Sequence, residues 1–262
     1  MSATKKPHPR QTIYFDRPST HYNLRIKQFP DHLKLSCFSK PIFNPEKLER
    51  AVDKPKCSEK RSYDVEHTRR DSLKRTIDKA TEIAYSNEWQ YFVTLTLDRQ
   101  KISRTDVSEI RRVLVKWLSN KVQRNDLRYL VFPEYHADGQ AIHFHGLMAG
   151  KLDLQDSGKV TKRGQTIYNT ESWPYGFTTV VHLTDNIAAV SQYIMKYITK
   201  DCKKIFGKYY FAGGKISREV PTSYDNVLYD DFEGEEYQVP NARLSVKYKP
   251  VPLDECGHMT GD

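Results

Sequence analysis

The sequence has only four cysteines, at positions 37, 57, 202 and 256, and no two of them are spaced as Cys-x-x-Cys. This spacing argues against a zinc ribbon and against a disulfide framework, so we expect reduced thiols. A Walker A loop is missing too, because Gly213-Gly214-Lys215-Ile216 lacks both the upstream spacing and a Ser or Thr after the lysine. We therefore do not expect the chain to act as a helicase by itself.

Long apolar runs are also absent, and no stretch approaches the roughly 18 consecutive apolar residues of a transmembrane helix. The residues after Met1 are charged at once and contain no apolar core of a signal peptide. No amphipathic anchor is evident either. These absences argue against secretion and against a membrane partner, and they favour a cytoplasmic protein.

Acidic residues are scarce in most of the chain but not at its end. The formal net charge is +9, yet residues 223–262 hold nine acidic and three basic residues, so the first 222 residues carry +15. Such an excess suits a polyanionic partner, and nucleic acid fits better than a membrane surface. The alternative is a basic surface that only keeps the protein soluble.

Composition divides the 262 residues into three parts. Residues 1–63 form a basic extension, in which alternation over Tyr22–Phe29 and His32–Phe38 suggests an accessory hairpin. Residues 64–222 have the patterns of a folded domain. Residues 223–262 form an acidic tail, which is most simply a solvated segment.

The central part alternates helical and strand patterns. Apolar residues at helical spacing predict helices over residues 64–89 and 105–123, and β-branched alternation predicts strands at Tyr91–Leu97 and Gly176–Leu183. A basic, polar loop is expected over residues 150–170. Together with the hairpin described next, the order predicts an α+β fold, a central antiparallel sheet with packed helices.

Three metal-ligand side chains lie close together on the predicted hairpin. Asp138-Gly139 between two β-prone runs is a strong turn signal. If these two residues form the loop, Glu134 lies directly opposite His143, and the period of two puts His145 on the same face. Opposed Cβ atoms are roughly 5 Å apart, so a carboxylate and two imidazoles can share one ion. The donor set suits Mn²⁺ well, and Mg²⁺ is a harder alternative.

A later segment predicts a helix with an unusual polar stripe. Ile187, Val190, Ile194 and Ile198 mark its apolar side. Residues three and four apart share a face, which gathers two phenols and two ammonium groups, those of Tyr193, Lys196, Tyr197 and Lys200. A lysine one turn from a tyrosine can lower the pKa of the phenol or neutralise a nearby phosphate.

Other residues have the composition of a nucleic-acid surface. Lys203, Lys204 and Lys208 alternate with aromatic residues up to Phe211, as in grooves that bind single strands, although an ordinary amphipathic strand has the same pattern. Thr94 and Thr96 lie on the polar face of the Tyr91 strand. They either contact DNA or are ordinary strand residues.

The ordered motifs resemble those of HUH endonucleases, in particular the rolling-circle replication initiators of phages and plasmids. The matching segments are Tyr91–Asp98, then Glu134 with His143-Phe144-His145, then Tyr193–Lys200, within roughly residues 64–220. Trp173-Pro-Tyr-Gly176 is similar too. The resemblance implies an RRM-like sandwich that nicks single-stranded DNA at a replication origin. A tyrosine would form a 5′-phosphotyrosine, leave a free 3′-OH for priming, and later rejoin the strands.

The resemblance also implies roles and partners. Tyr193 and Tyr197 would be nucleophiles, and Lys196 and Lys200 would position phosphate or activate the phenols. A host helicase and polymerase would supply unwinding and synthesis. Two alternatives stay open: a relaxase or transposase with the same nickase core, and a single-stranded nucleic-acid-binding protein without catalysis.

Overall fold

The computed structural model describes residues 20–29, 31–44, 65–183, 204–239, 243–253 and 259. These residues form two helices and twelve strands, and the bounds of each follow in chain order: β1 (His21–Gln28), β2 (His32–Phe43), α1 (Val65–Tyr85), β3 (Tyr91–Thr96), α2 (Val107–Asn125), β4 (Arg128–Tyr135), β5 (Ile142–Ala149), β6 (Leu154–Val160), β7 (Thr166–Thr170), β8 (Thr178–His182), β9 (Phe211–Gly213), β10 (Thr222–Asp225), β11 (Glu235–Gln238) and β12 (Ser245–Pro252).

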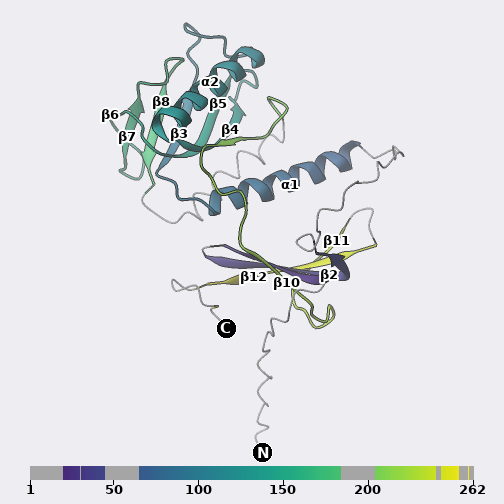
Figure 1. The fold of residues 1–262 in the computed structure, drawn as a ribbon. Helices are drawn as coiled ribbons and strands as arrows, with labels where there is room; N and C mark the ends of the chain where they lie inside the picture. The colour runs from purple at the N-terminus through teal and green to yellow at the C-terminus, as the bar shows by residue number, and fades with distance from the viewer. Residues whose placement is uncertain are drawn as a thin grey trace, which may run out of the picture. The chain divides into compact units, whose positions relative to one another are not determined.

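The chain divides into two compact units. One falls within residues 59–220, and the other combines residues 1–58 with residues 221–262. The described part of each unit contains one antiparallel sheet (Figure 1). The prediction of an α+β fold with antiparallel sheet and packed helices is confirmed.

The larger unit is built on a seven-stranded sheet with the strand order β6-β7-β8-β3-β5-β4-β9. Every paired neighbour in it is antiparallel. The strand predicted at Tyr91–Leu97 is β3, and it lies in the middle between β8 and β5. Central strands are fully hydrogen-bonded along both edges, so β3 and β5 form a rigid base for side chains that project from them.

Helix α2 covers one face of this sheet. Asp106 caps it, because its carboxylate accepts hydrogen bonds from the backbone N–H groups of Ser108 and Glu109 at 2.9 and 3.0 Å. The buried residues of α2 recur at helical spacing, and they are Ile110, Val113, Leu114, Trp117 and Leu118. They pack in one cluster with Val93 and Leu95 of β3 and Phe144 of β5. The expectation that this face of β3 meets a helical layer is confirmed.

Helix α1 packs on the opposite face (Figure 1). Its residues Ala80, Ile83 and Ala84 join a second cluster with Leu130 and Phe132 of β4 and Leu147 and Ala149 of β5. These strand residues alternate with those that face α2, as the period of two requires. The α1 face is thus apolar at one end of β4 and β5. At the other end it carries polar side chains.

The smaller unit contains a five-stranded sheet with the order β10-β1-β2-β12-β11. The alternation around residues 29–31 corresponds to the antiparallel pair β1 and β2. Residues 222–252 contribute the other three strands, and Val246 of β12 pairs with Phe38 of β2. The C-terminal segment thus shares a sheet with the N-terminal hairpin, which differs from the separate acidic tail that composition suggested.

Another difference concerns residues 150–170. A loop was expected there, but β6 and β7 form an antiparallel hairpin whose register shifts between Asp156 and Lys159. Of the seven residues of β6, none is buried. Its backbone pairing therefore holds it in place without an apolar face that a sequence pattern would reveal. Among the helices described, none combines the length and the apolar character needed to cross a bilayer.

Candidate metal centre

The β4–β5 hairpin has the predicted register. Glu134 pairs with His143, and Phe132 pairs with His145, so the paired numbers sum to 277 as expected. The loop itself differs from a two-residue turn, because the N–H of His136 donates to the carbonyl of Ala141 at 2.7 Å and leaves four residues between them. The centre of the loop is unchanged, and the register is therefore the same.

Asp138 stabilises this four-residue loop. Its carboxylate accepts hydrogen bonds from the backbone N–H groups of Gln140 and Ala141 at 2.8 and 2.9 Å. These two bonds favour the ionised form and hold the pKa of Asp138 below its ordinary value. Gly139 follows with φ of 70°, a conformation that glycine adopts at little cost. The sequence Asp138-Gly139 thus fixes the loop and, with it, the placement of the metal-ligand side chains.

Glu134, His143 and His145 converge on the polar end of the α1 face. One oxygen of Glu134, Oε2, lies 3.1 Å from Nε2 of His143 and 3.2 Å from Nε2 of His145. Ligands at right angles around an ion with bonds of about 2.1 Å are roughly 3 Å apart, so these separations suit neighbouring ligand positions. One candidate ligand atom from each residue lies within 4.8 Å of the others. The three side chains therefore form a group that can hold a metal ion.

Burial makes this group unlike an ordinary surface cluster. The side chain of Glu134 is 3 % exposed, and those of His143 and His145 are 13 % and 14 % exposed. A carboxylate this buried needs a compensating partner, which the two imidazoles or a bound cation provide. The exposed remainder of the imidazole rings leaves an opening for further ligands, as a catalytic rather than a structural site requires.

Thr94 orients one of the two imidazoles. It lies opposite His145 in the β3–β5 register, and its hydroxyl oxygen is 3.0 Å from Nδ1 of His145. The ring of Phe92 stacks on the same imidazole with centroids 6.1 Å apart. A hydrogen bond at Nδ1 fixes the ring so that Nε2 points to Glu134 and can bind a metal. Sequence reasoning had placed Thr94 among DNA-contacting residues and missed this contact, because it depends on which strand lies beside β3.

His136 and Gly146 also shape the centre, and neither was predicted to do so. The ring of His136 packs edge-on against that of His143, with centroids 4.2 Å apart. A Cβ on Gly146 would lie 2.6 Å from the carbonyl oxygen of Leu130, so β4 and β5 approach closely here only because position 146 lacks a side chain.

The Thr94 contact gives a prediction for metal affinity. Replacing Thr94 with Val should weaken Mn²⁺ binding by about tenfold, because loss of a partner that orients a metal-ligating His typically costs this much. Thr96→Val is the matched control, since Thr96 lies opposite His143 on the same face but its hydroxyl has no such bond to an imidazole in the described contacts. Calorimetric titration without DNA measures both. Equal affinity of the Thr94 variant and the unsubstituted protein would contradict the positioning role.

The remaining predicted site residues are placed as follows. Lys204 and Lys208 line a separate pocket at the β9 edge of the sheet. The predicted nucleophiles and their neighbours lie outside the described residues, and so does one more lysine of the nucleic-acid surface; these are Tyr193, Lys196, Tyr197, Lys200 and Lys203.

The fold and the centre define a chain with an antiparallel sheet that carries a Glu-His-His group. Residues 90–202 match the family model for the replication-associated protein ORF2. The matching range begins at the residue before β3, includes all three residues of the metal centre, and extends past Lys200. No curated protein and no solved structure matches the chain. The chain is thus similar to replication-associated proteins over the segment that holds the metal centre.

Proposed function

We propose that this chain is a replication initiator that nicks single-stranded origin DNA by tyrosine attack and later rejoins the strands. The observation that carries the proposal is the convergence of Glu134, His143 and His145 on one sheet face, within the range similar to replication-associated proteins. The same range contains the Tyr193–Lys200 segment, so one continuous piece of chain supplies both a metal centre and candidate nucleophiles.

Glu134, His143 and His145 would hold a divalent cation, which when bound polarises a phosphate oxygen as a Lewis acid. Two imidazoles and one carboxylate favour Mn²⁺, and Mg²⁺ is the harder alternative. Three protein ligands leave positions for phosphate oxygens. The burial of Glu134 supports this role, because a carboxylate shielded from water keeps its full charge for the ion instead of sharing it with solvent.

The reaction itself is a transesterification by Tyr193 or Tyr197. The phenol oxygen would form a bond to phosphorus while the bond from phosphorus to the 3′ oxygen breaks. The phenol loses its proton and the 3′ oxygen gains one, which gives a 5′-phosphotyrosine and a free 3′-OH without a change in the number of phosphodiester bonds. Lys196 and Lys200 would neutralise the phosphate. Rejoining is the same step in reverse.

The ends of the segment that carries the tyrosines support its reach to the metal centre. Leu183, the last described residue before it, packs in the α1 cluster, and Lys204, the first described residue after it, donates to the hydroxyl of Ser72 in α1. Both ends thus contact the face that carries the centre. Ten helical residues from Leu183 to Tyr193 would rise about 15 Å, close to the roughly 17 Å length of β3.

Covalent capture tests the proposal. The protein is incubated with single-stranded oligonucleotides that span its replicon, with and without Mn²⁺, and then resolved in SDS. A nickase leaves a slower, denaturation-resistant band that depends on the metal, together with a cleaved strand ending in 3′-OH. A protein that only binds nucleic acid leaves neither, and that result would overturn the proposal. A relaxase or transposase would also give the band, but cleavage would then map away from a replication origin.

A further inference from the structure

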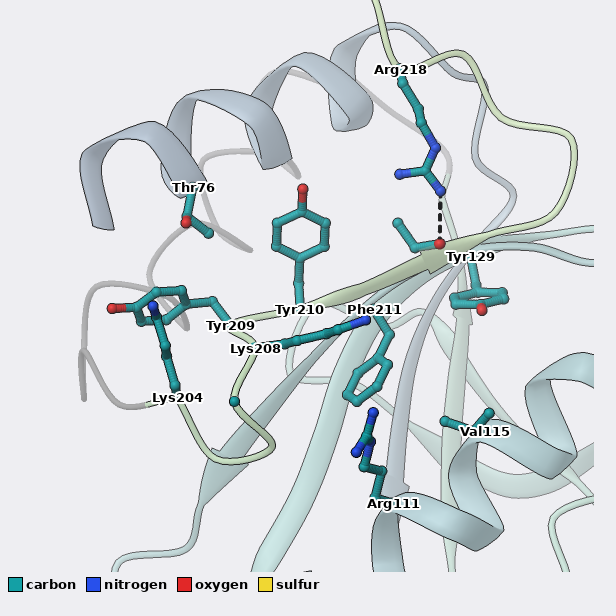
Figure 2. Close-up of a pocket in the computed structure, with 12 residues that line it drawn as sticks. Thr76, Arg111, Val115, Tyr129, Lys204, Lys208, Tyr209, Tyr210, Phe211 and Arg218 are labelled. Carbon is teal, nitrogen blue, oxygen red and sulfur yellow. Dashed lines mark hydrogen bonds between the residues drawn. The ribbon is translucent and has the colours of Figure 1, made fainter. Parts of the chain in front are cut away.

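A second cationic surface lies at the β9 edge of the larger unit, apart from the metal centre. A pocket of about 620 Å³ opens there (Figure 2). Four of its twelve lining residues are basic and none is acidic, and the basic ones are Arg111, Lys204, Lys208 and Arg218. They come from α2, from the segment before β9 and from the segment after it. Sequence reasoning had singled out only the two lysines.

The pocket continues along α2. A neighbouring cavity of about 830 Å³ shares Arg111, Val115 and Gly207 with it and adds Arg112 and Lys116. Of these two, Arg112 lies 3.8 Å from the carboxylate of Glu109. The surface therefore has a continuous positive tract rather than one isolated charge, as a ligand with several regularly spaced negative charges requires.

Aromatic rings line the pocket between these charges. Figure 2 shows the ring of Tyr210 standing between α1 and β9, while Lys208 extends along the strand toward Phe211. The amine of Lys204 lies 5.2 Å above the ring centre of Tyr209 and donates to Ser72 at 3.3 Å. Arg218 donates to the carbonyl of Ala212 at 2.9 Å, which holds its guanidinium at the pocket.

The tyrosines stay neutral in this positive setting. Burial raises the pKa of Tyr129 and of Tyr210, although the nearby Arg218 opposes the rise in both. Lys79 and Glu82 of α1 also act on Tyr210, and they form an ion pair at 2.8 Å. Uncharged phenols do not repel phosphate, and their rings offer apolar surface to a base.

We propose that this pocket binds an unpaired nucleotide of single-stranded DNA, with the base among the tyrosines and the flanking phosphates on Arg111 and Lys208. The identity of the polyanion as DNA rests on the proposed function. The concave shape favours a single strand over a duplex, because bases in a duplex are stacked inside and cannot enter a pocket. Rings beside cations are the composition of single-strand sites.

The distance to the metal centre sets which nucleotide enters the pocket. Tyr129 lines the pocket and Glu134 lies five residues further along β4, so the two are roughly 17 Å apart along the strand. Stacked nucleotides advance about 3.4 Å each, so the pocket would hold a nucleotide about five positions from the phosphate at the metal centre. Short oligonucleotides would reach only one of the two sites.

Charge removal at the pocket tests the proposal with oligothymidylates as probes. Arg111→Gln/Lys208→Gln should bind a strand of about 25 thymidylates some tenfold more weakly, and the slope of log affinity against log salt should fall by about 1.4 for two lost phosphate contacts. Both residues are exposed, so the fold should be unaffected. Lys162→Gln/Arg163→Gln is the matched control, since it removes the same charges from the exposed β6–β7 turn at the far edge of the sheet.

The result would overturn the proposal if the control variant lost as much affinity, if the slope stayed unchanged, or if a duplex of equal length lost affinity by the same factor. Placement of the base is tested by photocrosslinking a strand that contains 5-bromodeoxyuridine. We expect crosslinked peptides with Tyr129, Tyr209 or Tyr210, and crosslinks confined to other peptides would contradict the pocket. Neither measurement needs cleavage. Loss of the covalent adduct with intact pocket binding would thus refute only the nickase, and the converse would refute only the pocket.

Discussion

Replacing both Tyr193 and Tyr197 with Phe should abolish the covalent protein–DNA adduct, a loss on the order of 10⁴-fold or more. Each single replacement should leave measurable adduct, because we propose that either phenol can attack. Tyr→Phe removes only the phenol oxygen, so the aromatic ring and its packing are kept. The adduct on a cleaved oligonucleotide is quantified in SDS gels, and peptide mapping identifies the modified residue.

Tyr168→Phe provides the matched control, because Tyr168 lies on β7 in the same unit and contacts His182 rather than the metal centre. This variant should keep full activity. If one single variant is as inactive as the double variant, only that tyrosine is a nucleophile and the other has a positioning role. An adduct mapped to a residue outside 193–197 would contradict this assignment of the site.

The metal centre could be predicted from sequence because local chemistry determines it. The turn at Asp138-Gly139 sets the pairing of β4 with β5, and the period of two then decides which side chains share a face. The loop is longer than the expected two residues, but it grew by one residue on each side, so Glu134 still faces His143. A loop extended on one side only would have put the carboxylate on the other face.

The contact between Thr94 and His145 was not predictable in the same way. Alternation along β3 puts Thr94 on the polar face, but only the pairing of β3 with β5 places it opposite His145. That pairing joins strands about fifty residues apart, and no turn motif specifies it. The pocket at the β9 edge depends on more such pairings, because Arg111 and Lys208 come together only through the fold.

Composition also failed to identify the partners of the C-terminal segment. Its acidic character suggested a solvated tail, yet Tyr224 pairs with Arg25 and Lys247 pairs with Cys37. These pairs join residues about 200 positions apart, and the strands involved are short. Removing residues 223–262 would therefore take most of three strands from a sheet, so such a truncation would not test electrostatic shielding of the basic part by itself.

The second large effect is expected at the metal centre. His143→Ala/His145→Ala should abolish nicking while single-stranded DNA binding persists, because Lewis-acid polarisation is lost and the basic surfaces are unchanged. Excess EDTA should have the same effect on the unsubstituted protein. Glu134→Ala should weaken Mn²⁺ affinity but retain some activity at high Mn²⁺, since water can take one ligand position. His182→Ala is the matched control, because this imidazole on β8 contacts Tyr91 instead of the centre.

Loss of both imidazoles also leaves the buried carboxylate of Glu134 without these partners, which could destabilise the fold by about 1–3 kcal/mol. His143→Gln/His145→Gln keeps hydrogen-bond donors near Glu134 but removes the imidazole ligands, and it should be equally inactive. Thermal unfolding separates the two effects. Mn²⁺ at about 100 times its dissociation constant should stabilise the unsubstituted protein by about 2.7 kcal/mol and leave the Gln variant unchanged. Full cleavage by either double variant, or in EDTA, would contradict the metal centre.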